Sequence, residues 1–556
     1  MMTVVMNRLK LKEKTMKNLK YSLFLLALGL CTASVQAQVD EDITVKTKFE
    51  AKLNDAKKYN MQPKFPKSDT SKQALDYEIV SKLLEQQYDP PKIRPIAYKL
   101  DKLQKEYKGM AKLGAGNPNT ILGQLQYRDA INKQLIAGIE IDHLGSKNKN
   151  ITNQNFRETA ANINGSYFAK QGFLADASLG LNSRDFNYYA YNFIDSTQGL
   201  EIDAQDALQR YTKFDLAASI KNAERTVLDF NYALGFDFYR LTDNFASNEI
   251  GFNVEMNAQK WFKEKSYFNV DIETDLTRFE DTSIQNLHNF FIRPALLFQG
   301  SVFNAKIGAN LGFSNEVFFP FPDVNISYEL LDFLTVFAGA EGTLYKNNLN
   351  NTSIYNPYIN TTFNIQNTSI YHFFAGVKGN VGLLNYDAQV GLKRANDLAL
   401  FLDNPELENG FRRKFEVLYD TATIFNINAT INTKDINGIA FGGTVDLNTY
   451  SLSVEEKPWH LPTFALNGFV KYTGLDNDLQ IKADLFMENG VPYINDLGEA
   501  DNLNTLFDLS VNADYFFSDN IGVFLQLNNL ANNKRIRWNG YENYGFNIIG
   551  GINARF

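Results

Sequence analysis

Few residues of this sequence have the types and spacing that catalysis or metal binding requires. Asp271, Glu273 and Asp275 lie two residues apart, so on an extended strand their carboxylates share one face. That arrangement fits a hydrated wall better than a general acid and base. Neither a nucleophile elbow nor a phosphate-binding glycine loop is present. The histidines are scattered without metal-ligand spacing: His143, His288, His372 and His460. We therefore expect no enzyme, and no catalytic residue, metal or cofactor.

Two groups of aromatic residues are better candidates for ligand binding. They lie in segments that we predict to be long loops, 187–208 and 531–544, with Asn and Asp nearby. Rings beside polar groups can form an external binding surface, but loops that pack on themselves would use the same residues. The candidate ligand residues are Tyr188, Tyr189, Tyr191, Phe193, Trp538, Tyr541 and Tyr544.

The segments that carry these loops alternate between apolar and polar residues. From Leu228 to Phe238 the even positions are apolar, and the odd ones are Asp, Asn, Ala or Gly. Successive strand residues point to opposite faces, so each segment has one apolar and one polar face. A soluble sandwich shows the same pattern. Segments of ~10–14 residues with ionic polar faces instead favour tilted membrane strands around a wet lumen.

The connections between these segments alternate in length. Outer-membrane barrels have short periplasmic turns and long extracellular loops, so we predict a closed antiparallel transmembrane β-barrel of about 22 strands over 106–556. The least regular strands are 321–330, which opens with the pair Pro320 and Pro322, and 413–433, which could be two pieces; Pro294 suggests a bulge in 287–298. The predicted long loops are 187–208, 347–369, 397–412, 451–462, 489–504 and 531–544.

The N-terminus has the pattern of a secretory signal peptide over residues 1–37. Lys17 and Lys20 precede an apolar run, and small residues end it at Ala37, where we expect cleavage. Cleavage removes six basic residues and one acidic residue, so the net charge falls from −8 to −13. An exported, acidic chain is a poor nucleic-acid binder. Residues 38–105 are expected to be a periplasmic segment, partly helical near 71–86 or extended.

The last strand carries the most specific local pattern. Phe546, Ile548 and Ile552 share an apolar face, and the chain stops at Phe556. A terminal Phe on such a strand resembles the assembly signal of bacterial outer-membrane proteins. We therefore expect the Gram-negative outer membrane as the location, with lipid and the barrel-assembly machinery as partners.

The C-terminal stretch also resembles the final hairpin of TonB-dependent receptors of the Bacteroidetes type. The matching pieces are 524–530 with Asn533-Lys534, then 538–541, then 545–547. The resemblance implies a 22-stranded barrel, ligand binding or uptake, and TonB or a surface lipoprotein as partner. The chain departs from the family in one respect: the 68 residues of 38–105 are too few for its plug domain.

Size leaves the function open between three readings. About 22 tilted strands enclose a lumen roughly 40 Å across, whereas a 68-residue globule spans about 28 Å. Inward-folded loops or a partner must then help to close the lumen. The chain is a ligand receptor or transporter, a plugless porin, or a barrel that scaffolds other envelope proteins.

Overall fold

The computed structural model describes residues 106–194, 197, 199–224, 226, 228–262, 265–404, 406–534 and 536–556. The predicted signal peptide, the segment 38–105 and its helix near 71–86 lie outside the described residues. Among the described residues, no helix is long and apolar enough to span a membrane.

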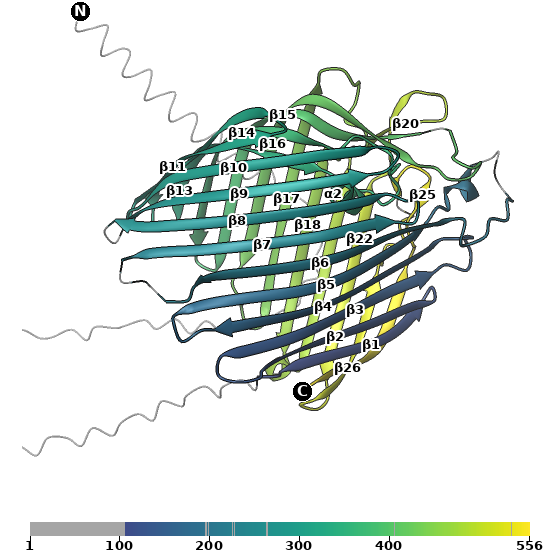
Figure 1. Ribbon diagram of the computed structural model, residues 1–556. Helices are drawn as coiled ribbons and strands as arrows, with labels where there is room; N and C mark the ends of the chain where they lie inside the picture. The colour runs from purple at the N-terminus through teal and green to yellow at the C-terminus, as the bar shows by residue number, and fades with distance from the viewer. Residues whose placement is uncertain are drawn as a thin grey trace, which may run out of the picture. The chain divides into compact units, whose positions relative to one another are not determined.

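Residues 109–555 form one closed sheet of 22 antiparallel strands (Figure 1), as the alternation predicted. Each strand pairs with the next along the chain, and the ladder from Met110↔Arg555 to Asn117↔Ile548 joins the last strand to the first. Every strand therefore has two neighbours, which satisfies the backbone groups that lipid cannot.

The barrel strands are β1 (Gly109–Asn117), β2 (Thr120–Ala130), β3 (Leu135–Lys147), β4 (Asn155–Phe168), β5 (Phe173–Asn187), β6 (Leu208–Asn222), β7 (Phe230–Asp243), β8 (Asn248–Phe262), β9 (Ser266–Glu280), β10 (Ile284–Gln299), β11 (Phe303–Ser314), β12 (Val317–Leu331), β13 (Leu334–Asn347), β14 (Gln366–Val381), β15 (Leu384–Asp403), β16 (Phe415–Thr433), β17 (Ile439–Leu452), β18 (Phe464–Gly474), β19 (Leu479–Asn489), β22 (Leu506–Phe516), β23 (Ile521–Asn528) and β26 (Asn547–Arg555). The loops carry two small hairpins, β20–β21 (Pro492–Ile494, Ala500–Asn502) and β24–β25 (Ile536–Trp538, Tyr541–Glu542).

The two faces of the wall differ in polarity. Apolar side chains such as Leu234 and Leu296 point outward and are 43% and 50% exposed on the isolated chain. Inward residues such as Asp237, Glu255 and Asp271 belong to the alternate positions of the same strands. A lipid-facing apolar belt around a polar lumen is the arrangement of transmembrane barrels.

The connections at the two ends differ in length, as predicted. Short turns lie at the end that carries the C-terminus, here called the terminal end. The opposite, loop end carries the long connections 188–207, 348–365, 404–414, 453–463, 490–505 and 529–546. The loop predicted at 397–412 starts later, because β15 continues to Asp403 past a bulge between Ala395 and Leu398.

The irregular strands are resolved as follows. Residues 415–433 form one strand, β16, and not two pieces. The bulge predicted at Pro294 is wrong: Pro294 pairs with Val270 of β9, and the register of β10 with β11 is unchanged on either side of it. A proline removes one donor without adding a residue, so the register can pass through it.

Candidate functional site: an inward hairpin and the loops that meet it

The wall branches between β12 and β13. Their ladder begins only at Asp323↔Glu341, although β12 starts at Val317. β13 and β14 stay paired beyond that point, as far as Asn347↔Gln366. The end of this hairpin, residues 342–371, therefore has no ladder to β12 and can turn away from it, while β14 stays paired with β15 as far as Ser369↔Asn396. We call it the inward hairpin.

Side-chain contacts show which way the hairpin turns. Leu344 and Tyr371 alternate with the lumen-facing residues of their strands, so in a flat wall they would face outward. Instead they pack against Phe291 and Phe321 of β10 and β12. Lys346 lies on the same face of β13 as Leu344, and its Nζ bonds Asp275 on the inner face of β9. The hairpin thus lies inside the barrel, with its outer face on the inner face of β9–β12.

Local sequence explains the branch. Pro320 and Pro322 lie on the part of β12 that has no β13 neighbour, and proline is tolerated at such a free edge. Gly342 leaves room for the turn, because a Cβ there would lie 2.4 Å from the ring of Phe321. The backbone carbonyl of Gly342 accepts a hydrogen bond from Asn310 Nδ2 at 2.9 Å. An amide side chain thus replaces a lost ladder bond.

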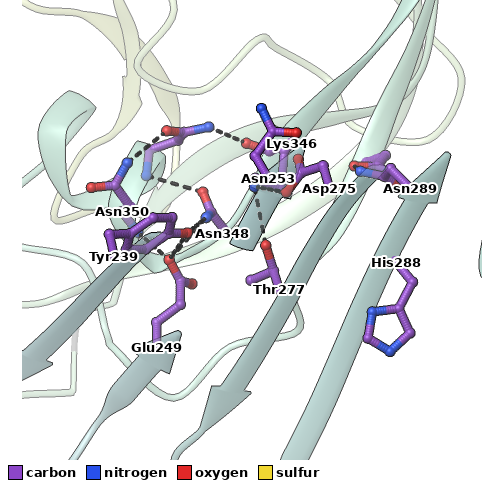
Figure 2. Close-up of polar contacts among 12 residues, drawn as sticks. Tyr239, Glu249, Asn253, Asp275, Thr277, His288, Asn289, Lys346, Asn348 and Asn350 are labelled. Atoms are coloured by element: carbon purple, nitrogen blue, oxygen red, sulfur yellow. Dashed lines mark hydrogen bonds and ion pairs between the residues drawn. The ribbon is translucent and has the colours of Figure 1, made fainter. Parts of the chain in front are cut away.

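A buried carboxylate holds the tip of the hairpin (Figure 2). Glu249, near the start of β8, is fully buried and accepts hydrogen bonds from Tyr239 Oη at 2.9 Å and Asn348 Nδ2 at 2.8 Å. It also accepts from the backbone N–H groups of Leu349 at 2.7 Å and Asn350 at 3.1 Å. These are the free donors at the start of the short helix α2 (Leu349–Tyr355). A buried charge is stable only when it is satisfied in this way.

Further polar contacts tie the hairpin to other wall strands. Lys346 Nζ lies 2.7 Å from Asp275 and 3.0 Å from Thr277 Oγ1 on β9, as Figure 2 shows. On β10, the Gln285 side chain bonds the backbone on either side of Asn364, and Asn289 bonds Asn367. The hairpin is therefore fixed to β8, β9 and β10 by hydrogen bonds and one ion pair, in addition to its apolar contacts with Phe279 and Phe291.

β5 and β6 hold the far side of the same loop. Arg184 of β5 donates to Ser353 Oγ at 3.1 Å, and Tyr211 of β6 donates to the carbonyl of Pro357 at 3.1 Å. β5 lies eight places from β13 in a ring of 22 strands. The loop after β13 therefore spans a large part of the lumen.

Other loops meet the hairpin over the lumen. Tyr358 stacks on Tyr541 at 3.6 Å between ring centroids, and Ile359 forms a parallel bridge with Phe415. Arg412, before β16, donates to the carbonyl of Asp206, before β6. β5 and β16 are eleven places apart, which is half of the ring, so loops attached to them can touch only across the lumen. The shared apolar cluster, here called the loop core, comprises Tyr188, Tyr189, Ala190, Tyr211, Leu241, Phe279, Leu287, Leu349, Tyr358, Ile359, Phe363, Ile365, Ala399, Phe401, Phe415, Val417, Trp538 and Tyr541.

The structure brings the two predicted aromatic groups together. Tyr189 packs edge-on against Tyr541 at 5.2 Å, and its hydroxyl donates to the carbonyl of Glu542. Tyr544 donates to the carbonyl of Gln154 at 2.7 Å. The remaining members differ in exposure: Tyr188, Tyr191 and Trp538 are buried, and Phe193 is exposed. Most of these rings contact other loops, which is the alternative of loop packing that the sequence left open. Their role in ligand binding stays a prediction.

Burial sets the protonation of the polar groups in the loop core. It raises the pKa of Tyr189 to about 12 and that of Tyr541 well above its usual value. Burial also lowers the pKa of His460 to about 3, and the nearby Arg537 and Arg413 add to that effect. The neutral ring donates from Nδ1 to the carbonyl of Phe401 at 2.7 Å and stacks on Trp538. At neutral pH this region therefore holds uncharged tyrosines and an uncharged histidine.

Phe556, the predicted assembly signal, lies at the seam of the barrel. Its backbone carbonyl accepts from the N–H groups of Lys108 and Gly109, and its own N–H donates to the carbonyl of Gly109. Its ring stacks on Tyr127 at 6.0 Å. The contacts join the last strand to the first; recognition by assembly machinery stays a prediction.

Sequence reasoning missed the residues that hold the hairpin. Glu249, Tyr358 and His460 stand in ordinary strand or loop sequence, and nothing local marks them. The one available signal was the Asn-rich stretch 347–351, because Asn side chains cap helix starts and bond free backbone groups.

Comparison with known proteins gives the fold but no family. No protein-family model and no curated protein matches this chain. Among solved structures, the FrpB iron transporter from Neisseria meningitidis is similar with a TM-score of 0.61 and 9% identity, over 82% of this chain and 83% of that one. The siderophore receptor PirA from Acinetobacter baumannii gives 0.61 and 11%, over 82% and 81%. The ferric-catecholate import receptor Fiu from E. coli K12 gives 0.59 and 9%, over 81% and 82%. At such identities the similarity concerns the fold.

Proposed function

We propose that this protein is an outer-membrane receptor that takes up a ligand, and that the inward hairpin and the loop core form its gate. The observation that carries the proposal is the contact between loops from opposite sides of the ring, such as Arg412 with Asp206. A lumen crossed by the chain's own loops needs a movable part before a ligand can pass. The similarity in fold to an iron transporter and to siderophore receptors supports uptake as the purpose.

The contacts of the inward hairpin suit a part that moves. Water can replace each of its polar bonds to β8, β9 and β10 when the hairpin shifts, whereas its apolar contacts with Phe279, Phe291 and Phe321 must separate. A hydrogen bond exchanged for water contributes only about 0.5–1.5 kcal/mol net, and one to a charged group about 1.5–3 kcal/mol. The wall strands below keep their ladders, so the gate can open without unfolding the barrel.

The orientation and partners follow from the same reading. The loop end would face the medium and the terminal end the periplasm, as in other outer-membrane barrels. The partners that we propose are the surrounding lipid, the barrel-assembly machinery, and TonB or a surface lipoprotein. Crossed loops disfavour a plugless porin. In an envelope scaffold the hairpin would stay permanently fixed, whereas in a receptor it must move, and a tether distinguishes the two.

The test is to tether the hairpin reversibly to the wall. The only cysteine of the chain, Cys31, lies in the predicted signal peptide, so an Asn289→Cys/Asn367→Cys pair introduces the reactive thiols. These two side chains already touch, at 2.7 Å. The probe is growth of a deletion strain under iron limitation on a panel of ferric siderophores, with each single-cysteine variant as control.

We expect the bridged form to lose uptake and a reductant to restore it, while both single variants behave like the wild type. If the wild type supports uptake and the bridged form supports it equally, the hairpin is not the gate. If no ferric siderophore is taken up by the wild type, iron uptake is rejected.

A further inference from the structure

One cavity beside the inward hairpin differs in its lining from two larger cavities of the barrel. A cavity of about 460 Å³ at the branch point is lined by Arg293, Asp323 and Lys393 among others, and one of about 420 Å³ on β4–β8 by Asp176, Asp237 and Glu255. A smaller cavity, of about 170 Å³, lies between α2, β13–β15 and the loop before β18. It has no charged residue in its lining. Within a polar lumen, that contrast points to a different kind of ligand.

The lining of this small cavity is aromatic and aliphatic. Its rings are Tyr345, Tyr355 and Phe401, with Ile370 and Leu461 beside them. Tyr345 is 51% exposed and Tyr355 38% exposed, although Tyr355 packs against Trp538 of the buried loop core. Tyr355 and Phe401 lie 5.0 Å apart between centroids. Open ring surface is thus available on the lumen side of the hairpin.

The polar groups of the lining are engaged within the protein. Asn347 donates to Thr368 Oγ1 at 2.8 Å, and Asn351 donates to the carbonyl of Lys346 at 2.8 Å. The hydroxyl of Tyr355 donates to the carbonyl of His460 and accepts from Arg537 Nη2 at 2.9 Å. The lining itself carries no charge, and the guanidinium of Arg537 beside Tyr355 is already paired with Glu488, so a charged ligand group would lose its hydration without gaining a free partner. The cavity therefore selects for apolar, uncharged surface.

We propose that this cavity binds one flat, uncharged ring of the ligand that passes the gate. An engineered apolar cavity of about 150 Å³ accepts benzene, whereas pockets for whole drug-sized ligands start at about 300 Å³. The available volume thus fits a single ring and not a complete large ligand. This inference rests on the proposed function for the ligand's route, but binding itself can be measured without uptake.

The experiment uses the full chain purified in detergent, with 4-bromophenol as the probe. Bromine quenches tryptophan fluorescence at short range, and Trp538 packs directly behind Tyr355 of the lining, 5.5 Å away between ring centroids. We expect saturable quenching with a midpoint on the order of 1 mM, typical of a fragment of this size. The Trp538→Phe variant should lose most of it, whereas Trp261→Phe, far away on β8, should keep it. The charged analogue 4-bromobenzoate should bind at least about tenfold more weakly.

Two variants locate the probe in this cavity. Tyr345→Ala removes an exposed ring and should weaken binding about tenfold. Ile370→Phe should fill the space and do the same. Tyr328→Ala, which removes an exposed outward ring of β12, is the matched control and should bind as the wild type. The heat-dependent gel shift of a folded barrel checks each variant.

Three outcomes would overturn the inference: quenching that does not saturate, equal binding of the benzoate, or no effect of Tyr345→Ala and Ile370→Phe in folded barrels. The site and the gate can also be separated. If binding saturates and responds to these variants, but the bridged Asn289→Cys/Asn367→Cys form takes up ligand like the wild type, the site is supported and the gate is rejected.

Discussion

Glu249 holds the tip of the inward hairpin by three hydrogen bonds. Its buried carboxylate accepts from two side chains and two backbone groups at the start of α2. Glu249→Gln removes the charge and places an amide N–H against these donors, so we expect docking to weaken by about 1.5–3 kcal/mol. The measurement is single-channel recording, in which brief openings should become more frequent. Glu255→Gln, on the same inner face of β8, is the matched control and should leave the record unchanged.

His460 should make the loop core sensitive to acid. Its pKa is about 3 when buried and 6.5 when exposed, so the open form binds more protons between these values. The closed form is then favoured above pH 6.5 and loses up to about 1.4 kcal/mol for each unit that the pH falls toward 3. The facing charges, Arg537 and Arg413, are paired with Glu488 and Asp403. We expect more open time at pH 5 than at pH 7.

The control for this effect is a pair of substitutions. His460→Asn keeps a donor for the carbonyl of Phe401 but does not titrate, so the difference between pH 5 and pH 7 should shrink. His288→Gln, at an exposed site on β10, should keep it. An unchanged pH dependence in His460→Asn would assign the effect to another group.

At the scale of the strand, the two faces of β7 should respond differently to charge. Leu234 points outward, and Asp237 points into the lumen. Leu234→Arg should reduce the free energy of unfolding by about 2–4 kcal/mol if it lies at the bilayer midplane, because lipid cannot solvate the guanidinium. Asp237→Arg should have a much smaller effect. Urea titration of the barrel in lipid vesicles measures both, and equal losses would mean that the faces are reversed.

The strands could be predicted from the sequence because each shows its own alternation of apolar and polar residues. Alternation between lipid and lumen is a local pattern, and the loops at the two ends differ in length. The branch at Gly342 could not be predicted, because a hairpin that turns inward keeps the same alternation; only its neighbour changes. Pro320 and Pro322 did signal an irregular strand, but the sequence could not say that the irregularity was a lost partner.

The candidate site was predicted only in part, for a similar reason. The rings of 187–208 and 531–544 were recognised as unusual for loops. Their contact with each other depends on which strands face each other across the ring. The part played by Tyr358 and Phe415 in the same core depends on that geometry too, which local sequence does not encode.

At the scale of the whole molecule, the closed ring explains why the loops can form a gate. Twenty-two strands give a lumen too wide for one loop to cross without support. The inward hairpin uses β8, β9 and β10 as anchors, and the loops before β6, β16 and β26 meet it in the middle. A wall that keeps its ladders around a separately held centre is what the proposed gate requires.

The most direct test of this account is the conductance of a barrel without the hairpin tip. Residues 349–363 would be replaced by a short Gly-Ser linker in the full chain, and assembly checked by the heat-dependent gel shift. The wild type should be closed for most of the recording, and the variant should show a stable pore on the order of nanosiemens, as expected for so wide a lumen. If the variant assembles and its conductance equals that of the wild type, the inward hairpin is not the barrier.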